Sequence, residues 1–157
     1  MKINAITFRS ACPVSSTLDI IGDRWSLLIV RDIVYYSKFS FGEFLRSREG
    51  IARNVLSNRL LKLEKAGILF KVDCPDDGRI RSYSLTEKGL DLIPLLFELT
   101  EWGATHVEST IASQEWLQIV AKDKMRAISV TRQAVTNGDS VFTGKGSAIN
   151  LLRNDHG

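Results

Sequence analysis

The spacing of apolar residues predicts that the first part of the chain is helical. A first helix is expected over residues 12–21, because Pro13 is tolerated in the first turn of a helix. Asp23 is a suitable cap for a second helix, in which apolar side chains recur at helical spacing from Trp25 to Tyr36. The pattern therefore predicts two helices before Ser37.

Start and stop signals define two more helices. Ser40-Phe-Gly-Glu43 has the sequence of a capping box, in which a serine and a glutamate satisfy each other's backbone N–H groups. It predicts a short helix that ends around Ser47. A longer helix is predicted over residues 52–66, with a stripe of core leucines, and Gly67 stands where a left-handed residue ends a helix.

After Gly67 the apolar period changes to 2. Residues 68–73 and 82–86 are predicted as strands, joined by a loop that carries Arg79 and Arg81. Helical spacing then returns. We expect one helix over residues 87–107, bent at Pro94, and another over residues 113–135. After Asn137-Gly138 the periodic signals fade.

Composition places the chain among globular proteins. Its 157 residues are 44% hydrophobic and 25% charged, and its apolar runs are far shorter than the about 20 residues of a membrane-spanning helix. The first ten residues contain no continuous apolar stretch, so we expect no secretory signal. Cys12 and Cys74 fit neither a disulfide framework nor a zinc site. These observations predict a cytoplasmic protein.

Basic residues gather in one segment. The net charge is only +3, but residues 46–65 contain Arg46, Arg48, Arg53, Arg59, Lys62 and Lys65 against two glutamates. A basic segment in a chain of mild charge suggests a surface that faces a polyanion, although a solvated helix face gives the same pattern.

The order of the predicted elements is that of a winged helix-turn-helix, a mainly α (α+β) fold with a two-stranded wing, flanking helices and a C-terminal helical extension. A helix fits the major groove of DNA, where arginine and asparagine can read base edges, and loop arginines can enter the minor groove. The residues predicted to contact DNA are Arg53, Asn54, Ser57, Asn58, Arg59, Lys62, Arg79 and Arg81. No acid lies between Arg53 and Lys62, which favours DNA over a solvated face, although Arg59 could instead pair with Glu64 or Glu43.

Short motifs within these elements resemble one family of regulators. They are Cys12-Pro-Val14, Leu18-Asp-Ile-Ile-Gly22, Trp25-Ser-Leu-Leu-Ile29, Phe39-Ser-Phe-Gly-Glu43, Gly50-Ile51, Leu56-Ser-Asn-Arg-Leu60, Leu63, Gly67, Tyr83-Ser-Leu-Thr-Glu-Lys-Gly89 and Trp102-Gly103. In this order and spacing the chain resembles the HxlR family, MarR-like winged-helix transcriptional regulators of bacteria and archaea. The resemblance implies a DNA-binding domain over residues 1–110. It leaves 111–157 as a C-terminal extension of unknown role.

The resemblance also implies a homodimer that binds an inverted repeat in double-stranded DNA. Its dimer contacts would come from the N-terminal segment and the helix after the wing. The residues assigned to this face are Leu18, Leu92, Ile93, Leu96, Leu99 and Trp102. From the apolar pattern alone, the last five could also belong to the core or line a ligand pocket, and the pattern favours the core or the dimer face over a pocket. Family members often have a Ser or Thr cap where Ala52 stands, so that helix start is expected to lack a side-chain cap.

Cys12 is a candidate sensor of oxidants or electrophiles. It precedes Pro13 at a helix start, where the helix dipole favours a thiolate, and several regulators that resemble this one use a cysteine there. The alternative is a cysteine with a packing role only. Control by a small-molecule effector and a role as a protein-interaction module also stay open. Trp116 and Phe142 would either line an effector pocket or pack against the helix after the wing.

No enzyme is indicated. Residues 138–146 resemble a phosphate loop, but five residues rather than four separate Gly138 from Gly144, and Gly146 stands where Ser or Thr should hold magnesium. His106 and His156 have no partner cluster, so we expect no metal site, no cofactor and no catalysis.

Overall fold

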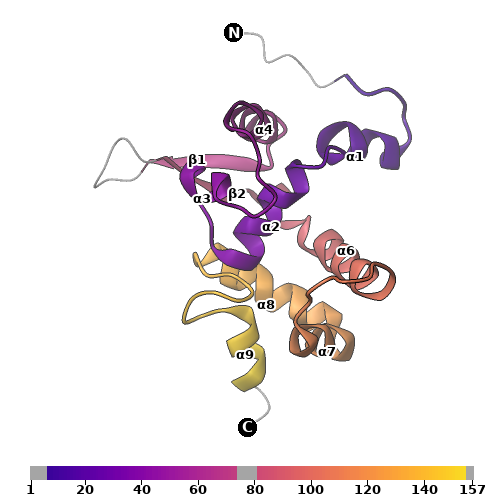
Figure 1. Ribbon diagram of the computed structural model, residues 1–157, viewed down its shortest axis with the longest axis vertical. Helices are drawn as coiled ribbons and strands as arrows, with labels where there is room; N and C mark the ends of the chain where they lie inside the picture. The colour runs from indigo at the N-terminus through magenta and orange to yellow at the C-terminus, as the bar shows by residue number, and fades with distance from the viewer. Residues whose placement is uncertain (1–6, 74–80, 155–157) are drawn as a thin grey trace. The chain divides into compact units, whose positions relative to one another are not determined.

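The structure is a computed structural model that describes residues 7–73 and 81–154 (Figure 1). Its elements are mostly helices, with one antiparallel pair of strands in the described part of the chain. In chain order they are α1 (Pro13–Ile21), α2 (Ser26–Tyr36), α3 (Phe41–Leu45), α4 (Arg53–Lys65), β1 (Leu69–Asp73), β2 (Arg81–Leu85), α5 (Glu87–Leu90), α6 (Ile93–His106), α7 (Gln114–Lys122), α8 (Lys124–Thr136) and α9 (Ala148–Asn154). This is the winged helix-turn-helix architecture that the sequence predicts.

The chain divides into two compact units. We call residues 1–32 and 38–89 the winged-helix unit, and residues 33–37 and 90–157 the C-terminal unit. The last turn of α2 therefore belongs to the C-terminal unit, as does α6. By its contacts α6 groups with the extension rather than with the winged helix.

The core of the winged-helix unit forms where the predicted apolar stripes meet. Phe44 of α3 and Leu56, Leu60 and Leu63 of α4 are buried. The capping box at the start of α3 is confirmed, because the Ser40 hydroxyl accepts the Glu43 N–H while the Glu43 carboxylate accepts the Ser40 N–H. It fixes the chain direction into α3, the first helix of the helix-turn-helix.

Strands β1 and β2 pair in register from Leu69 opposite Leu85 to Asp73 opposite Arg81 (Figure 1). The segment before α3 is hydrogen-bonded to β2, because the Tyr83 N–H donates to the Phe39 carbonyl at 2.7 Å. Residues 74–80 of the loop predicted to join the two strands lie outside the described residues. The wing is thereby anchored to the start of α3.

Both ends of α4 agree with the sequence. The helix begins after Ala52, whose methyl group cannot cap a backbone N–H, as expected. At the other end Gly67 has a φ of +69°, and the Ile68 N–H returns to the Leu63 carbonyl at 2.9 Å. The Lys88 ammonium donates to the Ala66 carbonyl at 2.8 Å, which satisfies another free carbonyl at the negative end of the helix.

The prediction of one bent helix over residues 87–107 is wrong. The structure has α5, a break at Asp91-Leu92, and then α6, in whose first turn Pro94 lies. A proline has no N–H to donate, but the first turn of a helix needs no such donor, so Pro94 starts a helix instead of bending one. Thr86 caps α5, because its hydroxyl accepts the Gly89 N–H at 3.1 Å.

The prediction of one helix over residues 113–135 is also wrong. It divides at Asp123, where the backbone leaves the helical region (φ −152°, ψ 85°). The Asp123 carboxylate accepts the Arg126 N–H at 3.0 Å and so caps α8. Sequence periodicity also gave no sign of α9, whose buried residues are Ala148, Ile149 and Leu152.

Aromatic side chains form the core of the C-terminal unit. Trp116 of α7 is buried and packs edge-on against Phe97 of α6, with ring centroids 5.4 Å apart, and against Phe142 at 6.0 Å. The predicted packing of Trp116 against the helix after the wing is confirmed. The segment after α8 also donates from Val141 N–H to the Val34 carbonyl at 2.8 Å. Among the described residues, every helix is too short or too polar to cross a membrane.

Candidate nucleic-acid interface

One side of α4 presents the side chains that the sequence assigns to DNA. Arg53, Asn54, Ser57 and Asn58 are exposed, while the opposite side of the helix carries the core leucines. The Arg53 guanidinium lies over the ring of Phe41, 5.4 Å from its centroid. This cation–π contact orients Arg53 without neutralising its charge. Nothing in the sequence pattern indicates this contact.

Arg59 and Lys62 are placed differently, because both face the carboxylate of Asp23. Arg59 Nη1 lies 3.4 Å and Lys62 Nζ 3.7 Å from Asp23 Oδ2. The sequence offered Glu64 or Glu43 as scaffold partners for Arg59, and neither assignment holds. Glu64 instead pairs with Lys71 at 2.9 Å, and Glu43 closes the capping box.

Asp23 also caps α2, as the sequence predicts. Its Oδ1 accepts the N–H groups of Trp25 and Ser26 at 3.0 and 2.9 Å, and its Oδ2 accepts the buried Ser26 hydroxyl at 2.5 Å. Burial alone would raise the pKa of Asp23. The hydrogen bonds from Ser26 and Trp25 and the charge of Arg59 outweigh it, so the pKa is lowered and the carboxylate is ionised at neutral pH.

A second ionic cluster joins α2 to the segments on either side of α3. Asp32 is buried, and it accepts hydrogen bonds from Arg31, from Lys38 at 3.2 Å and from the Ser47 hydroxyl. Arg31 also pairs with Glu49. Because this cluster holds the residues just before α4, it fixes how that helix is presented.

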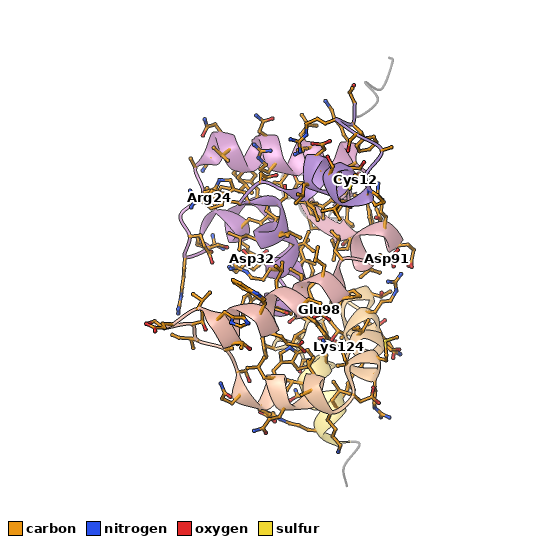
Figure 2. All side chains as sticks on the ribbon, turned by 90° about the vertical axis from the view of Figure 1, so that its right-hand side faces the viewer. Cys12, Arg24, Asp32, Asp91, Glu98 and Lys124 are labelled. Carbon is orange, nitrogen blue, oxygen red and sulfur yellow. The ribbon has the colours of Figure 1, made fainter. Side chains whose placement is uncertain are left out.

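Part of the predicted interface is outside the described residues. Arg79, the side chain of Arg81 and Cys74 fall there, so their assignments stay predictions. Cys12 is a free, exposed thiol at the start of α1, as Figure 2 shows. Its own N–H donates to the Ser10 hydroxyl at 3.2 Å.

The residues assigned to a dimer face are of two kinds. Ile93 and Leu96 are buried in the protomer, so they serve the core, one of the alternatives that the pattern left open, and Leu92 is half-buried. Leu99 and Trp102 are 47% and 61% exposed on α6, and Leu18 is 53% exposed on α1. The exposed members are the ones available to a second copy.

The described residues of the C-terminal unit include a candidate effector site and an apparent phosphate loop. An open depression of about 530 Å³ is lined by Glu101, Leu117, Val120 and Lys124, among others. Figure 2 shows Glu98 beside Lys124, and the Lys124 ammonium donates to Glu98 and Glu101 at 2.8 and 2.7 Å.

The apparent phosphate loop is already filled by a carboxylate of the chain. A Cβ atom added at Gly144 or Gly146 would lie 1.8 or 2.4 Å from the Asp139 side chain. The glycines therefore make room for Asp139. The described residues also hold no group of three or more His, Cys, Asp or Glu side chains placed to bind a metal.

The chain matches a known protein family over most of its length. A profile described as HxlR-like helix-turn-helix matches residues 20–111, more than half of the chain. The chain belongs to the HxlR-like helix-turn-helix family. The resemblance seen in the short motifs is thereby confirmed, and most of the extension lies beyond the matched residues.

Named relatives of this HxlR-like chain are transcription regulators. The HTH-type transcriptional regulator Rv3095 of Mycobacterium tuberculosis is 37% identical over 90 residues, which cover 57% of this chain and 56% of that protein. The chain thus spans little more than half of that relative's length. YybR of Bacillus subtilis, also an HTH-type transcriptional regulator, is 32% identical over 105 residues, or 67% of this chain and 83% of YybR.

Solved structures give the same result. The HxlR-like chain matches PA1607 with a TM-score of 0.60 and 40% identity, over 68% of this chain and 72% of that one. It matches the redox regulator HypR in its oxidized form with a TM-score of 0.55 and 31% identity, over 62% of this chain and 99% of HypR. The chain therefore carries the helix-turn-helix fold of transcription regulators.

Proposed function

We propose that the protein is a sequence-specific DNA-binding transcriptional regulator that acts as a homodimer on an inverted-repeat operator. The observation that carries this proposal is the exposed face of α4. Its residues from Arg53 to Asn58 include no acid, and they lie on the helix that follows the turn of a helix-turn-helix.

The chemistry of this face suits duplex DNA. Arg53 can donate two hydrogen bonds to a guanine edge, and Asn54 and Asn58 have the donor and acceptor pair that adenine requires. Ser57 can contact either a base or a phosphate. The wing arginines Arg79 and Arg81 are proposed to bind in the adjacent minor groove. Two copies related by a twofold axis would read half-sites about 34 Å apart, or a multiple of that distance.

The test is a fluorescence anisotropy titration with DNA from upstream of the protein's own gene and with random DNA, across a salt series. We expect tight binding to one of several tiled fragments and weak, steeply salt-dependent binding to random DNA. A protein that binds neither DNA at low salt would refute the proposal and favour the protein-interaction module. Sedimentation of the complex reports whether two chains bind each operator.

A second proposal concerns the signal, and it is supported by the exposed Cys12 thiol at the start of α1. The structural neighbour HypR is described as a redox regulator. We propose that two Cys12 thiols of a dimer lose two protons and two electrons to an oxidant and form a disulfide, with release of DNA.

The redox proposal is tested with diamide, which accepts the two protons and two electrons and becomes the hydrazine. Diamide should release operator DNA from the wild type and produce a reducible dimer on a gel. The Cys12→Ser variant should do neither, whereas Cys74→Ser serves as the matched thiol control. Diamide-dependent release that persists in Cys12→Ser would refute the role of Cys12. Specific binding by the wild type that does not respond to diamide would favour a small-molecule effector, for which the depression beside Lys124 is the candidate site.

A further inference from the structure

The Asp23 carboxylate contacts both the start of α2 and two cations of α4. Its carboxylate caps α2 through Trp25 and Ser26, and the same group faces Arg59 and Lys62 on α4. The basic residues of α4 therefore fall into two sets. Arg53 and Lys65 are exposed, whereas Arg59 and Lys62 face an internal carboxylate before any DNA arrives.

The contacts to Asp23 are loose. They measure 3.4 and 3.7 Å, longer than a charge-assisted hydrogen bond of about 2.8 Å, and the side chains of Arg59 and Lys62 are 30% and 35% exposed. Within the described residues, no acceptor reaches the buried Nε of Arg59. Ion pairs of this kind are weak, so a DNA phosphate can displace the carboxylate from either cation.

We propose that Asp23 limits binding to non-operator DNA by acting as an internal substitute for phosphate on Arg59 and Lys62. The inference rests on the proposed function, because it requires α4 to face DNA. Non-specific affinity comes mainly from contacts between cations and phosphates. A cation that must first leave an internal carboxylate adds less to that affinity than an unpaired one.

Binding to the operator depends less on Arg59 and Lys62 than binding to random DNA does. Base contacts of the exposed α4 residues fix the position of the helix in the groove, so Arg59 and Lys62 reach only the phosphates that this position allows. On random DNA the protein can shift until all available cations meet phosphates. Asp23 therefore increases the ratio of operator affinity to random-DNA affinity.

The Asp23→Asn substitution removes the charge, and it replaces Oδ2, which accepts the Ser26 hydroxyl, with an amide NH2 that can donate to that hydroxyl. Asparagine is about as good a helix cap as aspartate, and its amide oxygen can still accept the N–H groups of Trp25 and Ser26. Asp123→Asn is the matched control, because it makes the same change in charge at the cap of α8 in the C-terminal unit. Asp23→Ser offers the same test if Asp23→Asn does not fold.

The experiment measures anisotropy with random duplex DNA and with an operator selected from random oligonucleotides. Asp23→Asn should bind random DNA about three- to tenfold more tightly at low salt, with a salt slope steeper by about one to two, since each added phosphate contact contributes about 0.9. Operator affinity should rise less. In an Arg59→Gln/Lys62→Gln background, Asp23→Asn should have no further effect.

Three results would overturn the inference while leaving the proposed function intact. The first is unchanged binding of random DNA by Asp23→Asn. The second is an equal increase in Asp123→Asn, and the third is an increase that persists without Arg59 and Lys62, because either would reflect net charge alone. A wild-type protein that binds no DNA at low salt would refute both the inference and the proposed function.

Discussion

Arg31 binds Glu49 through both ends of its guanidinium group, with Nη1 2.5 Å from Oε1 and Nη2 3.1 Å from Oε2. Arg31 lies in α2, and Glu49 lies in the turn between α3 and α4. Paired hydrogen bonds between arginine and a carboxylate are among the strongest and most directional in proteins. This pair therefore ties the turn of the helix-turn-helix to the helix beneath it.

The Arg31–Glu49 pair predicts a specific acid sensitivity. The hydrogen bond from Arg31 lowers the pKa of Glu49 to about 2 from its usual 4.5. Because the native pKa is the lower one, the pair stabilises the fold fully above about pH 4.5, and this contribution is lost as the pH falls through about 2. Glu49→Gln should lower the free energy of unfolding near pH 7 by about 1 kcal/mol or less, since Glu49 is partly exposed.

Chemical denaturation of both proteins at several pH values checks this. The difference between wild type and Glu49→Gln should shrink steadily below about pH 4.5. A difference that stays constant down to about pH 2.5 would show that the charge of Glu49 is not what matters.

Asn54 and Arg79 should affect DNA binding in different ways. Asn54→Ala removes a side chain that is proposed to read a base, so it should cost about 1–3 kcal/mol on the operator and little on random DNA. Arg79→Ala removes a cation proposed to bind in the minor groove, beside the phosphates, so it should weaken binding to both DNAs and reduce the salt slope by about one. Anisotropy titrations of both variants with operator and random DNA measure these losses. Equal losses of Asn54→Ala on operator and random DNA would remove Asn54 from the reading set.

Trp102 provides a test of the proposed dimer. Trp102 is 61% exposed on α6, which is more than expected for a large aromatic residue on a surface that contacts no partner. If α6 meets a second copy, Trp102→Ala should raise the dimer dissociation constant at least about tenfold. Met125→Ala, which removes a 75% exposed side chain from α8, is the control. Sedimentation that gives equal dissociation constants for all three proteins would place the dimer face elsewhere.

Substituting alanine for Gly144 and for Gly103 should change the stability of the protein in opposite directions. Gly144 has a φ of +102°, and an added Cβ would lie 1.8 Å from Asp139 Oδ1. Gly144→Ala should therefore destabilise the protein by about 1–3 kcal/mol. Gly103 lies within α6, where an added Cβ meets no atom within 4 Å apart from its chain neighbours and the backbone of the helix itself, so Gly103→Ala should stabilise by up to about 1 kcal/mol. Thermal unfolding of both variants measures the contrast, and similar melting temperatures would contradict it.

Elements with local signals were predictable from the sequence. The capping box at Ser40, the left-handed Gly67 and the change of period after α4 each depend on a few neighbouring residues. The breaks at Asp91-Leu92 and Asp123 were missed because apolar spacing continues across them. Helix α9 was missed because its burial depends on packing within the C-terminal unit rather than on a long periodic pattern.

The candidate interface shows the same limit. The basic and polar residues of α4 were identified, because a helix face can be derived from spacing alone. The partner of Arg59 was not, because Asp23 lies 36 residues away in the sequence and approaches α4 only after α2 has packed. The sequence marked Asp23 as a cap, and a cap signal says nothing about what the second carboxylate oxygen meets.

Residues 140–142 are hydrogen-bonded to the end of α2, and this limits how the role of the extension can be tested. Val141 and Phe142 donate backbone hydrogen bonds to the carbonyls of Val34 and Tyr35, while Trp116 covers Phe97. A truncation at residue 110 would leave those carbonyls and that ring facing water. A shortened protein that loses activity would thus report misfolding of α2 and α6, so the role of the extension has to be separated by single substitutions on its outer surface.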